Sequence, residues 1–344
     1  MSDASIHNHQ PAASPGDEPA VARLMYASLS SVSHSVFEEI DKIRLRSMQR
    51  NAIDKISVAL LYQSGWFAQW MEGPPEGVQA VLARVSADPR HQSLHVLHQS
   101  SGPRRLGEPW SMAIVQTREE SAEFANRVMT LHQEYLSKRQ SEPAAIWRRL
   151  STPLTNPGAS RQALSDHFQR VMVCSALGTD SFNLVRWLGK TYSTEVVHRR
   201  FVGSRPESMD VGTDYVDLET GQTVRRIIAM ARHGLQIGLT QAFLSDYSHV
   251  IVLLSGLRER DRSLMERLLK ACEHLSHRPV IVGLGPSDAD HKTLQDLASR
   301  GGMIYLDCDI AGDTNPESLW AAAEMALDQS TGMDSVWPPS INPV

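Results

Sequence analysis

The chain has 344 residues, enough for two ordinary domains that each bury a core of their own. Its hydrophobic fraction of 41% and charged fraction of 21% are typical of a soluble globular protein, and no apolar run approaches the roughly 20 residues of a bilayer-spanning helix. The formal net charge of -5 argues against nucleic acid or an acidic membrane as a partner.

Residues 1–19 are rich in Ser, Pro and Ala and lack the basic start and apolar stretch of a signal peptide. We therefore expect a disordered tail on a cytoplasmic protein. The three cysteines, Cys174, Cys272 and Cys308, are scattered and odd in number. This pattern favours free thiols in a reducing compartment over a disulfide framework, and we expect no metal site.

Residues 20–117 carry alternating strand and helix signals. The run at 22–28 predicts a strand, and apolar residues then recur at helical spacing up to Met48, with Ser33 or Ser35 as the cap. Two strand-like runs meet at a hairpin signal at 63–65, a helix follows from Pro74 to near Pro89, and strands are predicted at 93–99 and 110–116. The order strand, helix, strand, strand, helix, strand, with one extra strand, predicts a ferredoxin-like α+β sandwich with both helices on one face.

An amphipathic helix is predicted at 119–139, with Phe124, Val128, Leu131 and Leu136 as its apolar stripe. We assign it to the first domain, residues 20–140. Residues 141–167 contain three prolines and many polar residues, so we interpret them as a linker with room for one short helix.

The segment 168–330 has a different pattern. Four strongly apolar runs at 170–176, 249–256, 278–285 and 303–309 alternate with helix-like stretches, and 213–230 predicts a hairpin that turns at Glu219-Thr220-Gly221. Continuous apolar strands between helices predict an α/β domain with a doubly wound, mostly parallel sheet. A Pro-rich tail, 331–344, follows the last helix.

Three polar side chains occur where core residues are expected in the first domain. Tyr26 is in the middle of the first strand, Gln69 alternates with Phe67 and Met71 on one face, and Asn51 lies at the end of the first helix. A buried amide without a partner costs about 1–3 kcal/mol. Spacing alone leaves two interpretations open: a polar cluster that satisfies itself, which spacing favours, or a ligand site.

The sequence around these residues resembles that of one protein family. The segments are LMYAS, the tripeptide Arg-Asn-Ala followed by IS-ALLY, then GWFAQWMEG, VQAVLARVSADPRH and EPWSMAIV, in this order over residues 21–117. They resemble a BLUF domain, the sensor of blue light using FAD. The resemblance implies an FAD cofactor and assigns roles: Tyr26 donates an electron and a proton, Gln69 lies between Tyr26 and flavin N5 and O4, and Asn51 holds the pyrimidine edge of the ring.

The same resemblance extends to further positions. Arg50 and Arg90 match basic positions that contact the flavin or its phosphate side, and Trp110 and Met112 match the pair of which one or the other lies near Gln69. The family usually has Gly-Ile-Thr-Gly where this chain has Lys-Ile-Ser-Val, so Val58 adds bulk where a glycine is usual. The implied consequence is a changed photocycle lifetime or FAD affinity.

The second segment resembles bacterial small-GTPase relatives from about 168 to 330. In VMVCSALGTDSFNLVRWLG, Gly178 of the phosphate loop is kept, but Asp180, Ser181 and Phe182 replace the second glycine, the lysine and the magnesium-binding hydroxyl. The Asp-x-x-Gly and Asn-Lys-x-Asp motifs are also altered, at 229–234 and 283–288. The resemblance implies a P-loop GTPase-like fold without catalysis, a pseudo-GTPase; the alternative is another doubly wound domain.

Together these interpretations predict a non-enzymatic blue-light photoreceptor. The FAD sensor would signal through the helix at 119–139 to a C-terminal domain that binds a protein partner, or through homo-oligomers formed by that domain or by the sheet of the first domain. Two alternatives remain: a light-regulated, nucleotide-hydrolysing enzyme, and a repressor antagonist that acts by dimer exchange.

Overall fold

The computed structural model describes residues 20–31, 36–117, 119–139, 141–152, 168–177, 179–205, 208, 210–220, 223–275, 277–286, 288–310 and 314–330. Both predicted tails, most of the predicted linker, the caps Ser33 and Ser35, Gly178, and Gly221 of the predicted hairpin lie outside these residues. Within α1 (Val36–Ile53), the side chains of 36–41 and 43 are not described.

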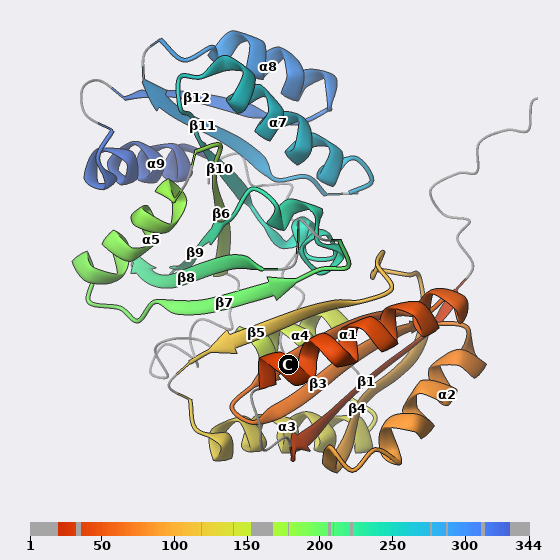
Figure 1. Cartoon of the computed structure of the whole chain (residues 1–344). Helices are drawn as coiled ribbons and strands as arrows, with labels where there is room; N and C mark the ends of the chain where they lie inside the picture. Colours follow the sequence, from red (N-terminus) through yellow and green to blue (C-terminus); the bar gives the residue numbers. More distant parts are fainter. Residues whose placement is uncertain are drawn as a thin grey trace, which may run out of the picture.

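The N-terminal half is an antiparallel-rich sheet with helices on both faces (Figure 1). Its strands are β1 (Val21–Ser30), β2 (Ser57–Gln63), β3 (Trp66–Gly73), β4 (His91–Gly102) and β5 (Ser111–Gln116), in the spatial order β5-β2-β3-β1-β4. Helices α1 and α2 (Pro75–Ser86) cover one face, whereas α3 (Ser121–Leu136) and α4 (Pro143–Ser151) pack on the other. The ferredoxin-like prediction is confirmed.

The C-terminal half continues as a mostly parallel sheet. Its strands are β6 (Phe168–Ser175), β7 (Val197–Val202), β8 (Val211–Thr220), β9 (Thr223–Met230), β10 (His249–Leu253), β11 (Val280–Pro286) and β12 (Tyr305–Ile310). Strands β6 and β9 to β12 run parallel, and β8 is antiparallel to both of its neighbours. The order is β12-β11-β10-β6-β9-β8-β7.

Helices cover both faces of this second half, as the continuous apolar strands predict. Helices α5 (Asp180–Thr191) and α9 (Pro316–Ser330) lie on one face, and α7 (Arg258–Cys272) and α8 (His291–Arg300) lie on the other (Figure 1). Short helical turns, η3 (Gly234–Gln236), α6 (Gly238–Gln241) and η4 (Leu244–Asp246), connect β9 to β10. All three cysteines are free thiols, and Cys174 and Cys272 are buried.

The helix after β5 packs as predicted except at its end. Phe124, Val128 and Leu131 are buried, but Leu136 is 58% exposed. Leu136 is the last residue of α3, where the chain turns away from the sheet, so its inclusion in the apolar stripe was wrong. The predicted linker contains α4, whose Ile146, Trp147 and Leu150 are buried.

One strand that the sequence did not predict, β7, joins the two halves. Strand β5 pairs with β2 in parallel and with β7 in antiparallel orientation, from Met112 opposite Val202 to Gln116 opposite His198. The two halves therefore form one 12-stranded sheet. On the face covered by α3, α4, α7 and α8, a single hydrophobic core runs through both halves, whereas the opposite face carries two separate cores.

Candidate functional site

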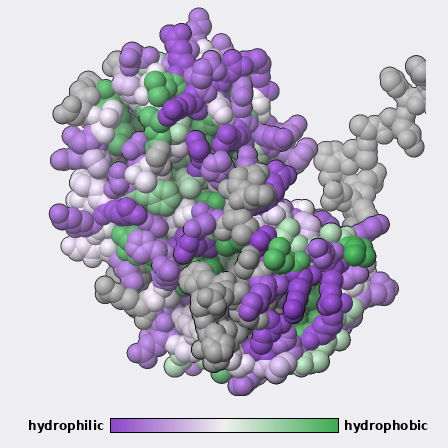
Figure 2. Space-filling model, in the orientation of Figure 1, coloured by the Kyte–Doolittle hydropathy of each residue, from purple (hydrophilic) through white to green (hydrophobic). Residues whose placement is uncertain are grey.

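A cavity of about 300 Å³ lies between α1, α2 and the sheet of the N-terminal half. Its floor is apolar and includes Leu60, Phe67 and Trp110, while charged side chains of both helices form its rim. Figure 2 shows hydrophilic side chains on either side of hydrophobic surface where α1 and α2 lie. A concave cavity with an apolar floor and a few convergent polar groups is the usual form of a small-molecule site.

Tyr26 and Gln69 meet on the face of the sheet below this cavity. They are directly opposite each other in the antiparallel register of β1 and β3, so their side chains stand side by side. The Tyr26 hydroxyl donates a hydrogen bond to Gln69 Oε1. Burial, reinforced by the negative charge of Asp88, raises the pKa of the Tyr26 phenol far above its ordinary value, so the hydroxyl keeps its proton at any physiological pH.

Two amides present unused hydrogen-bonding groups to the cavity. Because Gln69 Oε1 accepts from Tyr26, the Nε2 of Gln69 remains a donor, and no partner for it occurs among the described residues. Asn51, near the end of α1, donates from Nδ2 to the carbonyl oxygen of Pro109 at 3.1 Å. Its Oδ1 accepts nothing from the described part of the chain, so it can accept from a ligand. Of the predicted trio, Gln69 and Asn51 thus line the cavity, whereas Tyr26 is fully buried beneath it and is connected to it through its hydrogen bond to Gln69.

The other predicted site residues are placed differently. Trp110 lines the cavity, whereas Met112 is fully buried in the core beneath it and is not part of the described lining. Arg50 is exposed at the rim. Arg90 is also at the rim, where its Nε donates to Asp88 Oδ1 at 2.9 Å. Val58 is buried in the same core as Met112 and does not line the cavity, so its bulk leaves the described lining unchanged.

Sequence reasoning missed several lining residues. Lys42 and Arg46 precede Arg50 at intervals of four on α1, and Arg84 faces them from α2. The i, i+4, i+8 spacing was the available signal, since it places three basic side chains on one helix face. With Arg90 they give the described rim five cationic side chains. The described carboxylates near them are Asp88, in the lining, and Asp54, which lies 3.8 Å from Arg84. The surplus of positive charge suits an anionic group.

His91 is a further lining residue that was not predicted. Its Nδ1 lies 2.7 Å from Ser28 Oγ, and its ring is 6.1 Å from the ring of Tyr26 and 5.3 Å from that of Phe67. Burial lowers the pKa of His91, against the opposing effect of Asp88. The ring is therefore neutral at pH 7 and acts as a packing and hydrogen-bonding neighbour of Tyr26 rather than as a cation.

These features define a class of protein: an α+β domain with a cavity for a ligand that is anionic and forms hydrogen bonds. Residues 21–113 match the family model described as BLUF, sensors of blue-light using FAD. This segment is therefore a BLUF domain, which binds FAD as a blue-light sensor.

Two curated relatives match a stretch of 97 residues. Over 97 residues, 28% of this chain, the sequence is 34% identical to the photoactivated adenylate cyclase subunit alpha-like protein ST- of Euglena gracilis and 33% identical to photoactivated adenylate cyclase subunit alpha of the same organism. The match spans 9% of the length of each relative.

Among solved structures, the dark state of the BLUF protein BlrB is 24% identical, with 39% of this chain and 97% of that chain covered and a TM-score of 0.28. A bacterial light-regulated adenylyl cyclase is 15% identical, with 74% of this chain and 68% of that chain covered and a TM-score of 0.26.

The residues of the cavity fit FAD. The free Nε2 of Gln69 and Oδ1 of Asn51 supply one donor and one acceptor beside an apolar floor, as the edge of an isoalloxazine requires. The basic rim suits the two phosphates. Gln69 and Asn51 would hold the ring, and Lys42, Arg46 and Arg50 would face the phosphates.

Residues 180–182, for which the sequence predicted an altered phosphate loop, lie at the start of α5. Asp180 begins α5 and is exposed, Ser181 is buried, and Phe182 packs against the core on the α5 face. Ser175 Oγ donates to the carbonyl oxygen of Leu177 at 2.9 Å and so closes the preceding turn on itself. No helix within the described ranges is both long and apolar enough to cross a membrane.

Proposed function

We propose that this chain is a blue-light photoreceptor in which the BLUF domain controls a non-catalytic, GTPase-like protein-interaction domain through the shared sheet. The observation that carries this proposal is the pairing of β5 with β7, because it connects the flavin cavity and the C-terminal half by backbone hydrogen bonds. The proposal has three parts: a light-driven change at Gln69, its transmission, and the output.

The change begins at the hydrogen bond between Tyr26 and Gln69. When bound, FAD supplies the absorption of blue light and an acceptor for an electron. The Tyr26 phenol, protonated and in contact with Gln69 Oε1, can release an electron and its proton together toward that amide. An amide has one donor and one acceptor end, so the Gln69 side chain has two stable arrangements, with either its oxygen or its nitrogen toward Tyr26. Light would convert one of these arrangements of the Gln69 side chain into the other.

The route from Gln69 to the C-terminal half would be β5. Asn51 binds the Pro109 carbonyl immediately before Trp110, and Trp110 leads directly into β5. Two residues further, Met112 pairs with Val202 of β7. A shift of Trp110 against the cavity is therefore coupled to β7 without any intervening loop. The helix α3, which follows β5 in the chain, would be a second route by which the change at Gln69 is transmitted.

The C-terminal half supports a role in binding rather than catalysis. Its strand order, with one antiparallel strand beside a parallel set, agrees with a GTPase-like fold carrying the additional strand β7. At the start of α5, however, a carboxylate, a buried serine and a phenylalanine occupy the places of the phosphate-binding glycine, lysine and hydroxyl. Asp180 would repel a triphosphate, and Phe182 supplies no hydroxyl at the position where the motif places a magnesium ligand.

The first experiment compares absorption spectra of the purified full chain before and after blue light. We expect bound FAD and a small red shift that reverses in the dark. Gln69→Leu should retain FAD and lose the shift, because leucine keeps the volume without the amide. The matched control Gln99→Leu changes an exposed position of the same sheet on β4 and should behave as wild type.

The second experiment follows hydrogen exchange of β7 in darkness and in light. Amides of 197–202 should change their exchange rate in the wild type and in Gln99→Leu but not in Gln69→Leu. Equal rates for β7 in both light states of the wild type would refute the β5 route. Turnover of GTP or ATP in either light state would instead identify the output as an enzyme.

A further inference from the structure

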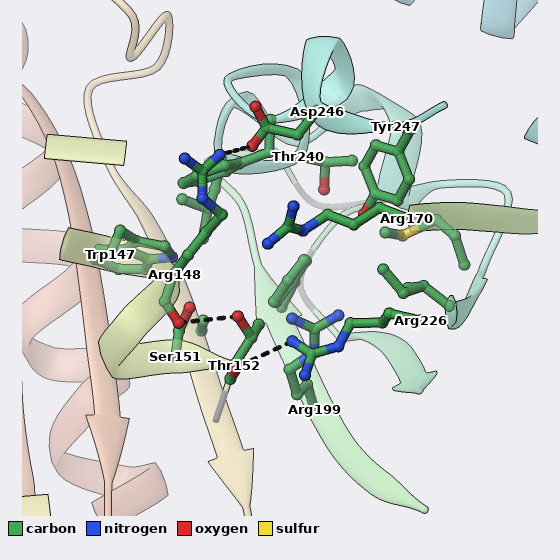
Figure 3. A pocket seen from close by; sticks show the side chains of 16 residues that line it. Trp147, Arg148, Ser151, Thr152, Arg170, Arg199, Arg226, Thr240, Asp246 and Tyr247 are labelled. Atoms are coloured by element: carbon green, nitrogen blue, oxygen red, sulfur yellow. Dashed lines mark hydrogen bonds and ion pairs between the residues drawn. The ribbon is translucent and has the colours of Figure 1, made fainter. Parts of the chain in front are cut away.

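A second cavity lies at the junction of the two halves, on the face of the sheet opposite the flavin cavity. It measures about 50 Å³ and is enclosed by α4, by strands β5, β6, β7 and β9, and by the turns around 239–247 (Figure 3). Ala113 of β5 and Phe201 of β7, which are paired in register, both contribute to its wall. The BLUF domain and the C-terminal half thus build this cavity together.

Four guanidinium groups converge on this small space. They come from three strands and one helix, and Figure 3 shows those of the strands directed toward α4. The four residues are Arg148, Arg170, Arg199 and Arg226. Arginine is rarely buried without a carboxylate partner, because removing a cation from water is expensive.

Two of the four charges are already neutralised. Arg226 makes two hydrogen bonds to the carboxylate of Asp217, from Nε at 2.7 Å and from Nη2 at 2.8 Å. Arg148 forms an ion pair with Asp246 on the other side of the cavity. Burial opposes the charge of Arg226, but Asp217 outweighs it and holds the pKa of Arg226 above its ordinary value.

Arg170 and Arg199 have no such partner. Within the described ranges, the Arg170 guanidinium makes no hydrogen bond or ion pair and lies over the ring of Phe168 at 4.5 Å. Arg199 is 6% exposed; its Nε has no hydrogen-bond acceptor among the described residues, and its Nη2 reaches only Thr213 Oγ1 at 3.4 Å. Burial lowers the pKa of Arg170 to about 10 and also lowers that of Arg199. A guanidinium keeps its proton in proteins at neutral pH, so both side chains carry a charge.

Neutral donors complete the wall. Thr240 is 3% exposed, and its hydroxyl finds no partner in the described part of the chain. Burial raises the pKa of Tyr247 to about 12, so its hydroxyl stays protonated and can donate. Among the described residues, the cavity therefore contains two positive charges without a directly paired carboxylate and at least one orphaned buried hydroxyl, and its remaining wall is largely apolar.

We propose that this junction cavity binds a doubly charged oxyanion, the phosphate group, held by Arg170, Arg199 and Thr240. A dianion balances the two surplus charges, its oxygens offer acceptors to every orphaned donor, and a phosphate group matches the volume, whereas a nucleobase does not. The site is also separate from the altered nucleotide loop: Arg170 is near the amino end of β6, and that loop follows its carboxyl end.

The test uses the full chain with FAD, in darkness, and measures thermal unfolding and titration calorimetry with inorganic phosphate. Millimolar phosphate should raise the midpoint of unfolding by about 3 °C or more, because an anion that binds only the folded state stabilises it. Sodium chloride at equal ionic strength should not. The absence of both a phosphate-specific shift and calorimetric binding would overturn the proposal.

Two variants separate binding from folding. Arg170→Gln removes a buried charge that has no described carboxylate partner, so the phosphate-free protein should be as stable as wild type or more stable, while phosphate affinity falls at least tenfold. Thr240→Val removes the orphaned hydroxyl and should weaken binding about threefold to tenfold at unchanged stability. The matched control Arg200→Gln alters the next residue of β7, which is paired with Asp210 outside the cavity, and should bind phosphate as wild type does.

A further arm distinguishes free phosphate from a phosphate group carried by a larger molecule. GMP, GTP and ATP are titrated alongside inorganic phosphate into the wild type and Arg170→Gln. Saturation by inorganic phosphate alone identifies a site for the free ion, and tighter binding of a nucleotide that Arg170→Gln abolishes identifies a carried phosphate group. Binding that survives unchanged in Arg170→Gln would refute the assignment of the site.

Discussion

The shared sheet predicts that the two halves unfold as one unit, and Trp320→Ala tests this from the far end of the molecule. Trp320 lies on α9, is 2% exposed, and belongs to the core between α5, α9 and the sheet, which contains no residue of the BLUF domain. Truncation of a buried tryptophan costs about 3–5 kcal/mol, through lost apolar contact and the cavity it leaves. The hydrogen bond from its Nε1 to the Tyr192 hydroxyl at 3.2 Å is lost as well.

The measurement is urea unfolding with two signals on one sample: flavin release, which reports the BLUF domain, and far-ultraviolet circular dichroism, which reports the whole chain. For a chain of this size, a loss of about 4 kcal/mol lowers the midpoint by about 1 M urea. We expect both signals to shift together by this amount. The reason is that β5 cannot keep its pairing with β7 when β7 unfolds, and the core under α4 is common to both halves.

Met325→Ala is the control, since Met325 is on the same helix but 59% exposed, and its midpoint should stay within about 0.2 M of wild type. If Trp320→Ala produced an early transition in circular dichroism while flavin release kept the wild-type midpoint, the halves would be independent. That result would refute both the cooperative sheet and the transmission route through β5.

Three further predictions follow from buried charges and from coupling. Asp217→Asn leaves the fully buried Arg226 without its carboxylate and should destabilise the chain by about 3–5 kcal/mol in urea unfolding; a wild-type midpoint would contradict this. Burial, with a contribution from Arg23, lowers the pKa of His98 to about 4. Between about pH 6.5 and pH 4 the unfolded chain therefore takes up a proton that the folded chain refuses, so stability falls as the pH falls, and His98→Gln should flatten this dependence. Finally, if light alters β5, phosphate bound at the junction should change the rate of dark recovery in the wild type and leave Arg170→Gln unaffected.

The local patterns of the sequence predicted most of the fold. Period-two alternation placed Gln69 on the face of Phe67, and the pairing of β1 with β3 then set it opposite Tyr26. Continuous apolar runs predicted the parallel strands β6, β10, β11 and β12. These predictions were correct for a common reason. The face on which a side chain lies follows from its neighbours in the same strand, and a strand that is buried on both faces is apolar along its whole length.

What the sequence did not predict depends on distant partners. Strand β7 contains His198, Arg199 and Arg200 in succession, so it lacks a clean alternation, and its partner β5 lies some eighty residues earlier. Arg199 is buried because the rings of Phe201 and Tyr215 lie 5.4 and 4.9 Å from its guanidinium, an arrangement no local pattern encodes. The linker was expected to hold at most one short helix, but the burial of α4 could not be predicted for the same reason, since its apolar face packs against both halves at once.

Strand β5 gives the two cavities a physical connection that neither half has alone. Alternate residues of a strand face opposite sides of a sheet, so Met112 points into the core beneath the flavin cavity while Ala113 forms part of the junction cavity. Strand β3, which β2 separates from β5, repeats the arrangement. Gln69 faces the flavin side, and the ring of Trp70 lies 6.4 and 6.2 Å from those of Trp147 and Phe243, which line the junction. A movement of β5 or β3 that accommodates a new arrangement of Gln69 must therefore move the wall of the anion site. By linkage, an anion that prefers one arrangement of that wall must also favour one light state, to the same extent in free energy.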